Sequence, residues 1–137
     1  MTAPLYTRDI LRLAASIPYL EPIEEVDGYA EKRSPTCGSR VSVGVRMTEG
    51  RVAALSQSVE ACAFGQASAA LMGAGAVGRS EAELREALAG IERWLNGDDE
   101  PTWPGMEVLA PARARKGRHG AILLPFVTLL AAVEDAR

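Results

Sequence analysis

Apolar and polar residues alternate along the middle of the chain, and this alternation predicts a β-hairpin. In residues 41–47 an apolar side chain occupies every second position, a period of two that is typical of a strand with one buried face. Glu49-Gly50 then turns the chain into a second apolar run over residues 52–59. A further short strand is expected over Gly28–Arg33. The sequence therefore predicts β-structure between residues 28 and 59.

Apolar residues spaced three and four positions apart predict a helix on each side of this β-region. A short amphipathic helix is expected over residues 5–17, where Ile10, Leu13 and Ile17 share one face and Pro18 ends the helix. Residues 62–77 are small and compatible with a helix that packs closely against a sheet. The order of the predicted elements is thus helix, strands, helix.

Two more helices are predicted in the C-terminal half. Ser80 and Glu83 form a capping box ahead of an apolar stripe that runs to Leu95, and Asn96-Gly97 provides a stop signal. Residues 98–111 contain several prolines and are expected to be irregular, apart from a short turn.

The last helix is predicted from the strongly apolar run over residues 122–136. Proline is tolerated in the first turn of a helix, because the N–H that it lacks has no partner there. Pro125 would fall in that turn if the helix began just after His119-Gly120. We therefore expect His119 to lie immediately before the helix.

Length and charge limit the classes of function. A chain of 137 residues with 47% hydrophobic residues can bury one sizeable core, so one domain over residues 1–137 is expected. Its net charge of −3 provides no positive field for nucleic acid or an anionic membrane. Arg8, Asp9 and Arg12 interrupt the N-terminal apolar residues, and no run approaches the ~20 apolar residues of a spanning helix. We expect a cytoplasmic protein with reduced thiols.

The candidate chemistry rests on Cys37, Cys62 and His119, which are all the cysteine and histidine that the chain has. Each lies at the end of a predicted element. A thiol at a helix N-terminus has its thiolate favoured by the helix dipole, so Cys62 suits a metal ligand or a sulfur nucleophile equally. Gly38 and Gly65 would allow the backbone to approach a bound ion or cluster closely.

The residues around both cysteines resemble the NifU/IscU family of iron–sulfur cluster assembly scaffolds. The resemblance is carried by Ser-Pro-Thr-Cys-Gly-Ser-Arg at residues 34–40, by the hairpin, and by Cys62 with Ala67-Ser68 after it in a helix. It runs from about Ser34 to the C-terminus. The long connection over residues 96–116, with no chaperone motif before His119, looks more like the SufU-type branch.

The sequence departs from the family pattern at two positions. Gly120 stands where the family has its third cysteine, and Ser39 stands where it has an aspartate after Cys-Gly. A two-iron cluster and a structural zinc both take four ligands, so one coordination position is left open. Ser39 is a weak substitute for a carboxylate because its hydroxyl stays protonated unless a metal acidifies it.

The resemblance implies an α+β fold of the IscU/SufE type, with a small antiparallel sheet of about three strands and helices packed on one face. It further implies a non-enzymatic scaffold that holds iron or a labile iron–sulfur cluster, or else zinc, through Cys37, Cys62 and His119, with Ser39 beside them. Its expected partners are a cysteine desulfurase and acceptor iron–sulfur apoproteins. A homodimer could supply the missing ligands.

The sequence also leaves other functions open. The chain could be a zinc-organised sulfur acceptor that activates a desulfurase, or a degenerate interaction module that has lost its metal. A Cys–His hydrolase is weaker, since no oxyanion-hole motif accompanies the pair.

Each candidate residue also has a purely structural interpretation. Cys62 could be a small buried helix residue, Cys37 a turn residue, and His119 a helix-start residue bonded to the backbone. A basic run beside His119 could dock an acidic patch of a desulfurase or be a solvated loop. The residues of this run are Arg113, Arg115, Lys116 and Arg118.

Overall fold

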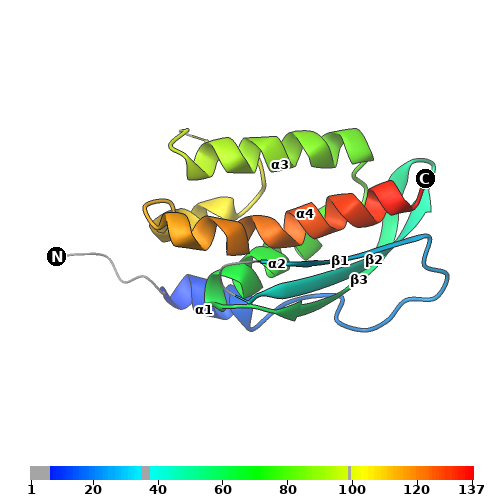
Figure 1. The fold of residues 1–137 in the computed structure, drawn as a ribbon, viewed down its shortest axis with the longest axis horizontal. Coiled ribbons are helices and arrows are strands. Elements are labelled where there is room, and N and C mark those ends of the chain that lie inside the picture. The colour runs from blue at the N-terminus through cyan, green and yellow to red at the C-terminus, as the bar shows by residue number, and fades with distance from the viewer. Residues whose placement is uncertain (1–6, 35–37, 99) are drawn as a thin grey trace.

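The computed structural model describes residues 7–34, 38–98 and 100–137, and these form a three-stranded sheet with helices on one side (Figure 1). The strands β1 (Gly28–Arg33), β2 (Arg40–Thr48) and β3 (Arg51–Glu60) pair antiparallel in the order β1-β2-β3. Glu49 and Gly50 have φ angles of 52° and 77°, which suit the tight turn of a two-residue hairpin. The predicted strands and their turn are confirmed.

Both faces of β2 are covered, although its alternating pattern predicted one buried face. Val41, Val43 and Val45 are fully buried beneath the helices. On the opposite face the segment over residues 15–27 crosses the sheet, and Val26 lies so close that a Cβ on Gly44 would be 3.4 Å from its Cγ1. Small residues therefore alternate with valine in β2 because a chain segment packs over them.

The helices form two layers on the inner face of the sheet. Helix α4 (His119–Asp135) packs on β1 and β2, and α2 (Ala63–Ala76) lies beside it and reaches β3. Helix α1 (Arg8–Ala14) flanks α2, whereas α3 (Glu81–Leu95) packs on α4 as an outer layer (Figure 1). The predicted α+β class with helices on one face is confirmed.

Helix α1 ends earlier than predicted. It begins after Thr7, whose hydroxyl accepts a hydrogen bond from the N–H of Ile10 at 3.2 Å. It ends at Ala14, because the Ser16 hydroxyl donates to carbonyls of the last turn and Pro18 disfavours helical backbone at the residue before it. The expected start at Leu5 lies outside the described residues.

Helix α4 starts three residues earlier than predicted, so His119 is its first residue and not the residue before it. Pro125 consequently lies inside the helix, in its second turn. A proline there has no N–H to donate to the carbonyl four residues back, which is that of Ala121. The helix tolerates this loss because α4 is held by packing, with most of its side chains buried.

The segment Lys116–Asp135 is long and apolar enough to cross a membrane by length and composition, although no such run was expected. More than half of it is buried within the fold, as is typical of a core helix in a globular protein.

The connection from α3 to α4 is more regular than its prolines suggested. Two 3-10 helices, η1 (Met106–Ala112) and η2 (Lys116–Arg118), lie within it. Ahead of them Trp103 is buried, and its indole N–H donates to the carbonyl of Leu71 in α2 at 2.7 Å. The connection is thereby tied to the core and brings the chain back to the start of α4.

Candidate functional site

Three segments that are distant in sequence meet at the end of the molecule where α2 and α4 begin. The Ser34 N–H donates to the carbonyl of Ser39 at 2.9 Å and so closes the β1–β2 end of the sheet. A Cβ on Gly120 would lie 3.8 Å from the hydroxyl of Ser34, and a Cβ on Gly65 would lie 3.4 Å from the carbonyl oxygen of Ala121. The start of α4 therefore lies between the strand ends and the start of α2.

Small residues allow α2 and α4 to approach each other closely here. The Ser68 hydroxyl donates to the carbonyl of Ile122 at 2.5 Å, deep in the core. One turn earlier in α2, Gly65 faces the carbonyl of Ala121, to which Pro125 has no N–H to donate. A Cβ on Gly65 would lie 2.7 Å from that of Ala61. This close packing brings the two helix N-termini to the same place.

Cys62 is the N-cap residue of α2, as the sequence predicted. Its backbone is extended and its carbonyl accepts the N–H of Gln66 at 2.9 Å, but its side chain makes no capping hydrogen bond. The residue is partly exposed and is a free cysteine, not a fully buried helix residue. The thiol therefore lies at the positive end of the helix dipole without a structural task in the helix.

His119 lies at the N-terminus of α4 and is partly buried. Its Nε2 is 2.9 Å from the backbone carbonyl oxygen of Arg113. His119 is therefore a helix-start residue that is hydrogen-bonded to the backbone, as its structural interpretation predicted, but only through Nε2. The other nitrogen, Nδ1, has no hydrogen-bond partner among the described residues.

Cys37 lies outside the described residues, so its place in the site stays a prediction. The residues on either side of it are at the site end: Ser34 and Ser39 are 7% and 3% exposed. Gly38 has a φ of 71°, a left-handed conformation that favours glycine over other residues. The ligand role of Ser39 likewise stays a prediction, and the residue is buried.

The predicted basic run divides into two parts. Arg113 points back onto α3, where its Nε donates to the carbonyl of Trp94 at 2.9 Å. Arg115 and Lys116 are exposed, and Arg118 is partly exposed beside His119. The Arg113 side chain is thus engaged within the fold, and docking by the run stays a prediction that its last three residues would carry.

An ion cluster on the outer face of the sheet was missed by the sequence analysis. Arg40 donates to Glu31 at 2.9 Å and to Glu60 at 2.7 Å, just before the strand that leads to Cys62 ends. The hydrogen bond from Arg40 is the main cause that lowers the pKa of Glu60, and the two carboxylates raise the pKa of Arg40. The signal was available, because the hairpin register places Arg40 opposite Glu60.

Of the four predicted donors, Cys62, His119 and Ser39 lie within the described residues. Within residues 7–34, 38–98 and 100–137 no group of three or more His, Cys, Asp or Glu side chains could hold a metal ion. A thiolate and a neutral imidazole both suit iron and zinc, and Gly120 leaves space beside His119, since a Cβ on it would come no nearer than 3.8 Å to any atom of the described residues beyond its own helix. The donor types suit an iron or zinc ion, and a further donor is needed to complete its coordination.

Solved structures with a similar fold include proteins from two bacteria. The N-terminal domain of a nitrogen-fixing NifU-like protein from Brucella abortus is 31% identical, with a TM-score of 0.87, over 96% of this chain and 94% of that one. A protein from Fervidobacterium islandicum AW-1, named as an iron–sulfur cluster assembly scaffold for the SUF system, is 21% identical with a TM-score of 0.79, over 94% of this chain and 96% of that one. No protein-family model and no curated protein matches the sequence.

Proposed function

The chain belongs to the family of NifU-like N-terminal domains, and from this premise we propose that it acts in iron–sulfur cluster assembly as a scaffold. The observation that carries the proposal is the meeting of three segments at one end of the fold. Cys62 begins α2, His119 begins α4, and the strand ends that flank Cys37 lie beside Gly120. These are the places where the family resemblance puts the ligands.

In this proposal the cargo is iron with sulfide, held by the thiolates of Cys37 and Cys62 and by the imidazole of His119. The coordination position that Gly120 leaves open keeps the cargo labile, because a two-iron cluster takes four protein ligands. Ser39, a water molecule or a second copy of the chain would complete the coordination. A labile cargo is what a scaffold needs in order to pass it to an acceptor apoprotein.

The proposed donor of sulfur is a cysteine desulfurase, and the proposed compartment is the cytoplasm. The exposed residues Arg115 and Lys116 and the partly exposed Arg118 lie on the connection that leads into His119 and could meet an acidic surface of that partner. In this role the protein holds the cargo and passes it on without converting a substrate into a product, so we classify it as a scaffold and not as an enzyme.

A sulfur acceptor is the second candidate, and the state of Cys62 favours it. Cys62 is partly exposed at a helix N-terminus, and its deprotonated form can attack the outer sulfur of a persulfide on the desulfurase. The new S–S bond then lies on Cys62, and the cysteine thiolate of the desulfurase leaves. Zinc would in this case only organise the site.

The deciding experiment measures iron, zinc and acid-labile sulfide in protein purified without oxygen, before and after reconstitution. Wild-type protein should hold iron and sulfide in equal amounts, and Cys37→Ser, Cys62→Ser and His119→Ala should lose both. Thr48→Ala, an exposed residue at the other end of β2, is the matched control and should keep them. Zinc alone, with stimulation of a desulfurase, would favour the sulfur acceptor. No metal under any condition would leave a degenerate interaction module.

A further inference from the structure

Arg113 is fixed to the C-terminal end of α3 by its whole guanidinium group. Its Nε donates to the carbonyl of Trp94 at 2.9 Å, and its Nη2 donates to the carbonyl of Asp98 at 2.6 Å. The guanidinium carbon also lies 4.9 Å from the centroid of the Trp94 ring, close enough for a cation–π interaction. Trp94 is only 2% exposed, so Arg113 is attached to a rigid part of the core.

The backbone of the same residue contacts the candidate site. The carbonyl oxygen of Arg113 is 2.9 Å from Nε2 of His119. A carbonyl oxygen can only accept a hydrogen bond, so Nε2 must carry the proton. A neutral imidazole has one N–H, which leaves the lone pair on Nδ1.

We propose that Arg113 is a positioning residue for His119, which it holds as the Nε2–H tautomer so that Nδ1 is the atom presented to a borderline-soft divalent cation such as Fe²⁺ or Zn²⁺. The side chain anchors the connection on α3, and the carbonyl orients the ring. A hydrogen bond from the second nitrogen is the usual way in which a protein sets the tautomer and direction of a ligating histidine. The inference rests on the proposed function in so far as His119 is a ligand of the cargo.

The neighbouring Arg115 offers a matched control. It lies two residues further along the same connection, it is exposed, and no hydrogen bond or ion pair of its side chain is found among the described residues. Arg115→Ala therefore removes the same charge from the same segment without releasing the segment from α3. Arg113→Lys keeps the charge but cannot reproduce the two hydrogen bonds of the guanidinium fork.

The first test is the nitrogen-15 NMR spectrum of the imidazole in metal-free protein at about pH 8.5, where a histidine ring is ordinarily neutral. His119 is the sole histidine, so its ring signals need no assignment. We expect an unprotonated Nδ1 and a protonated Nε2, with Nε2–H protected from exchange, in the wild type and in Arg115→Ala. Arg113→Ala should lose the protection and show averaged tautomers, and Arg113→Lys should do so in part. An Nδ1–H tautomer in the wild type, or an unchanged spectrum in Arg113→Ala, would overturn the inference.

The second test is zinc affinity measured by competition with a chromophoric chelator. Loss of an outer-sphere partner of a ligating histidine typically weakens metal binding about 10-fold to 100-fold, and we expect this for Arg113→Ala but not for Arg115→Ala. In a His119→Ala background, Arg113→Ala should cause no further loss. An equal loss with and without His119 would show a general structural effect and overturn the inference. The ring spectra of metal-free protein test the inference without any metal. The zinc affinity of the single variant His119→Ala tests the proposed ligand role, so the two failures can be told apart.

Discussion

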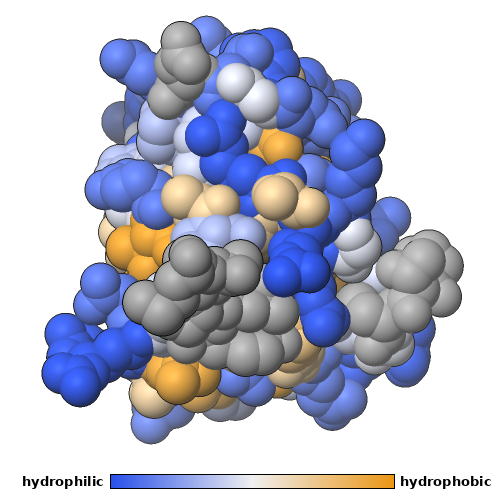
Figure 2. All heavy atoms as spheres, turned by 90° about the vertical axis from the view of Figure 1, so that its left-hand side faces the viewer, coloured by the Kyte–Doolittle hydropathy of each residue, from blue (hydrophilic) through white to orange (hydrophobic). Residues whose placement is uncertain are grey.

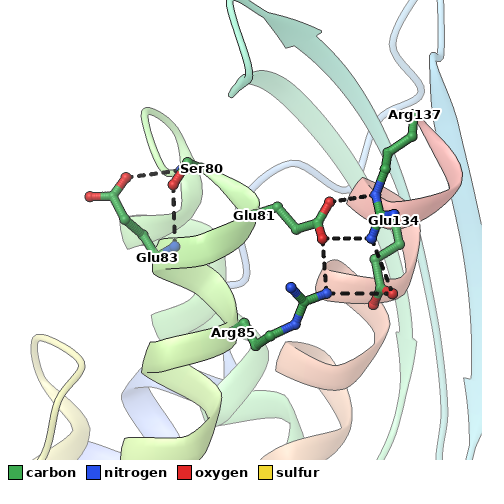
Figure 3. A network of polar contacts seen from close by, with 6 residues as sticks. All are labelled: Ser80, Glu81, Glu83, Arg85, Glu134 and Arg137. Carbon is green, nitrogen blue, oxygen red and sulfur yellow. Dashed lines mark hydrogen bonds and ion pairs between the residues drawn. The ribbon is translucent and has the colours of Figure 1, made fainter.

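The helix termini at the two ends of the molecule use polar side chains differently. At the end away from the candidate site, where α3 begins and α4 ends, Glu81 accepts hydrogen bonds from Arg137 at 2.7 and 2.8 Å and from Arg85 at 2.8 Å (Figure 3). Beside them Ser80 and Glu83 form the predicted capping box, with bonds of 3.2 and 3.0 Å. Here charged and polar groups of one chain satisfy each other and fasten two helices together.

At the site end the helices begin without such help. Neither Cys62 at the start of α2 nor Arg118 at the start of α4 makes a side-chain capping bond. His119 uses one ring nitrogen and leaves the other available. Figure 2 looks onto this end of the molecule, where hydrophobic side chains lie between hydrophilic ones. The far end therefore pairs its charged groups within the chain, whereas at the site end the Cys62 side chain makes no capping bond and Nδ1 of His119 has no hydrogen-bond partner among the described residues.

Cys62→Ser should break this comparison most strongly. Serine is a far better N-cap than a residue that makes no capping bond, so the free energy of unfolding should rise by up to about 1 kcal/mol. Binding of iron and sulfide should be lost, because a serine hydroxyl is a poor ligand at neutral pH. Urea unfolding and metal analysis of the same preparation test both effects. Retained binding, or a fall in stability, would contradict the trade-off between capping and ligation.

Gly120→Cys should sharpen the comparison by adding a donor to the site end. Among the described residues beyond α4, the nearest atom to a Cβ at this position is the hydroxyl oxygen of Ser34, at 3.8 Å, so a Cβ meets no clash with them. With another thiolate available, zinc affinity should rise about tenfold or more. Gly120→Ala is the control, since it shares any gain in helix propensity but adds no ligand. Equal zinc affinities in the two variants would show that residue 120 does not face the cargo.

Gly65→Ala tests how tightly the start of α2 is packed beside the site. The added methyl group would lie 2.7 Å from Cβ of Ala61, so the turn that leads into α2 must shift, whereas its distance of 3.4 Å from the carbonyl oxygen of Ala121 in α4 is an ordinary contact. Overpacking of this kind typically costs about 1–3 kcal/mol, and chemical denaturation measures that loss. Gly117→Ala, whose Cβ would meet open space, should leave stability nearly unchanged.

Glu81→Gln should have the smallest effect at neutral pH, because exposed ion pairs contribute little to stability. The hydrogen bond from Arg137 is the main cause that lowers the pKa of Glu81 below its ordinary value of 4.5. A carboxyl whose pKa is lower in the folded state adds stability above the ordinary pKa, and this stability is lost as the pH falls through the lowered value. Thermal unfolding between neutral and acidic pH should therefore show a shallower acid-induced loss in Glu81→Gln than in the wild type. A steeper loss, or a change in metal binding, would contradict the division between the two ends.

Local patterns predicted most of the elements. The strand β1, the hairpin and its Glu49-Gly50 turn are confirmed, and so is the capping box at Ser80. These features depend on residues within a few positions of one another, so they can be seen in the sequence. The position of Cys62 at the start of α2 follows from the same local rules.

Predictions that depended on distant packing were less accurate. The start of α4 was placed after His119 to keep Pro125 in the first turn, but burial of the helix outweighs one missing hydrogen bond. Arg113 was grouped with its basic neighbours, although its side chain stacks on Trp94 in another helix. Neither contact leaves a periodic signal in the sequence.

The sequence by itself determined the chemistry that this protein has available. It contains two thiols and one imidazole at the ends of elements, and the surrounding residues resemble one family. Only the tertiary structure decided that the starts of α2 and α4 meet beside the ends of β1 and β2, and that His119 turns Nε2 towards Arg113. The physical reason is range: residue spacing encodes hydrogen bonds and faces within one element, whereas the convergence of elements depends on how their buried surfaces pack together.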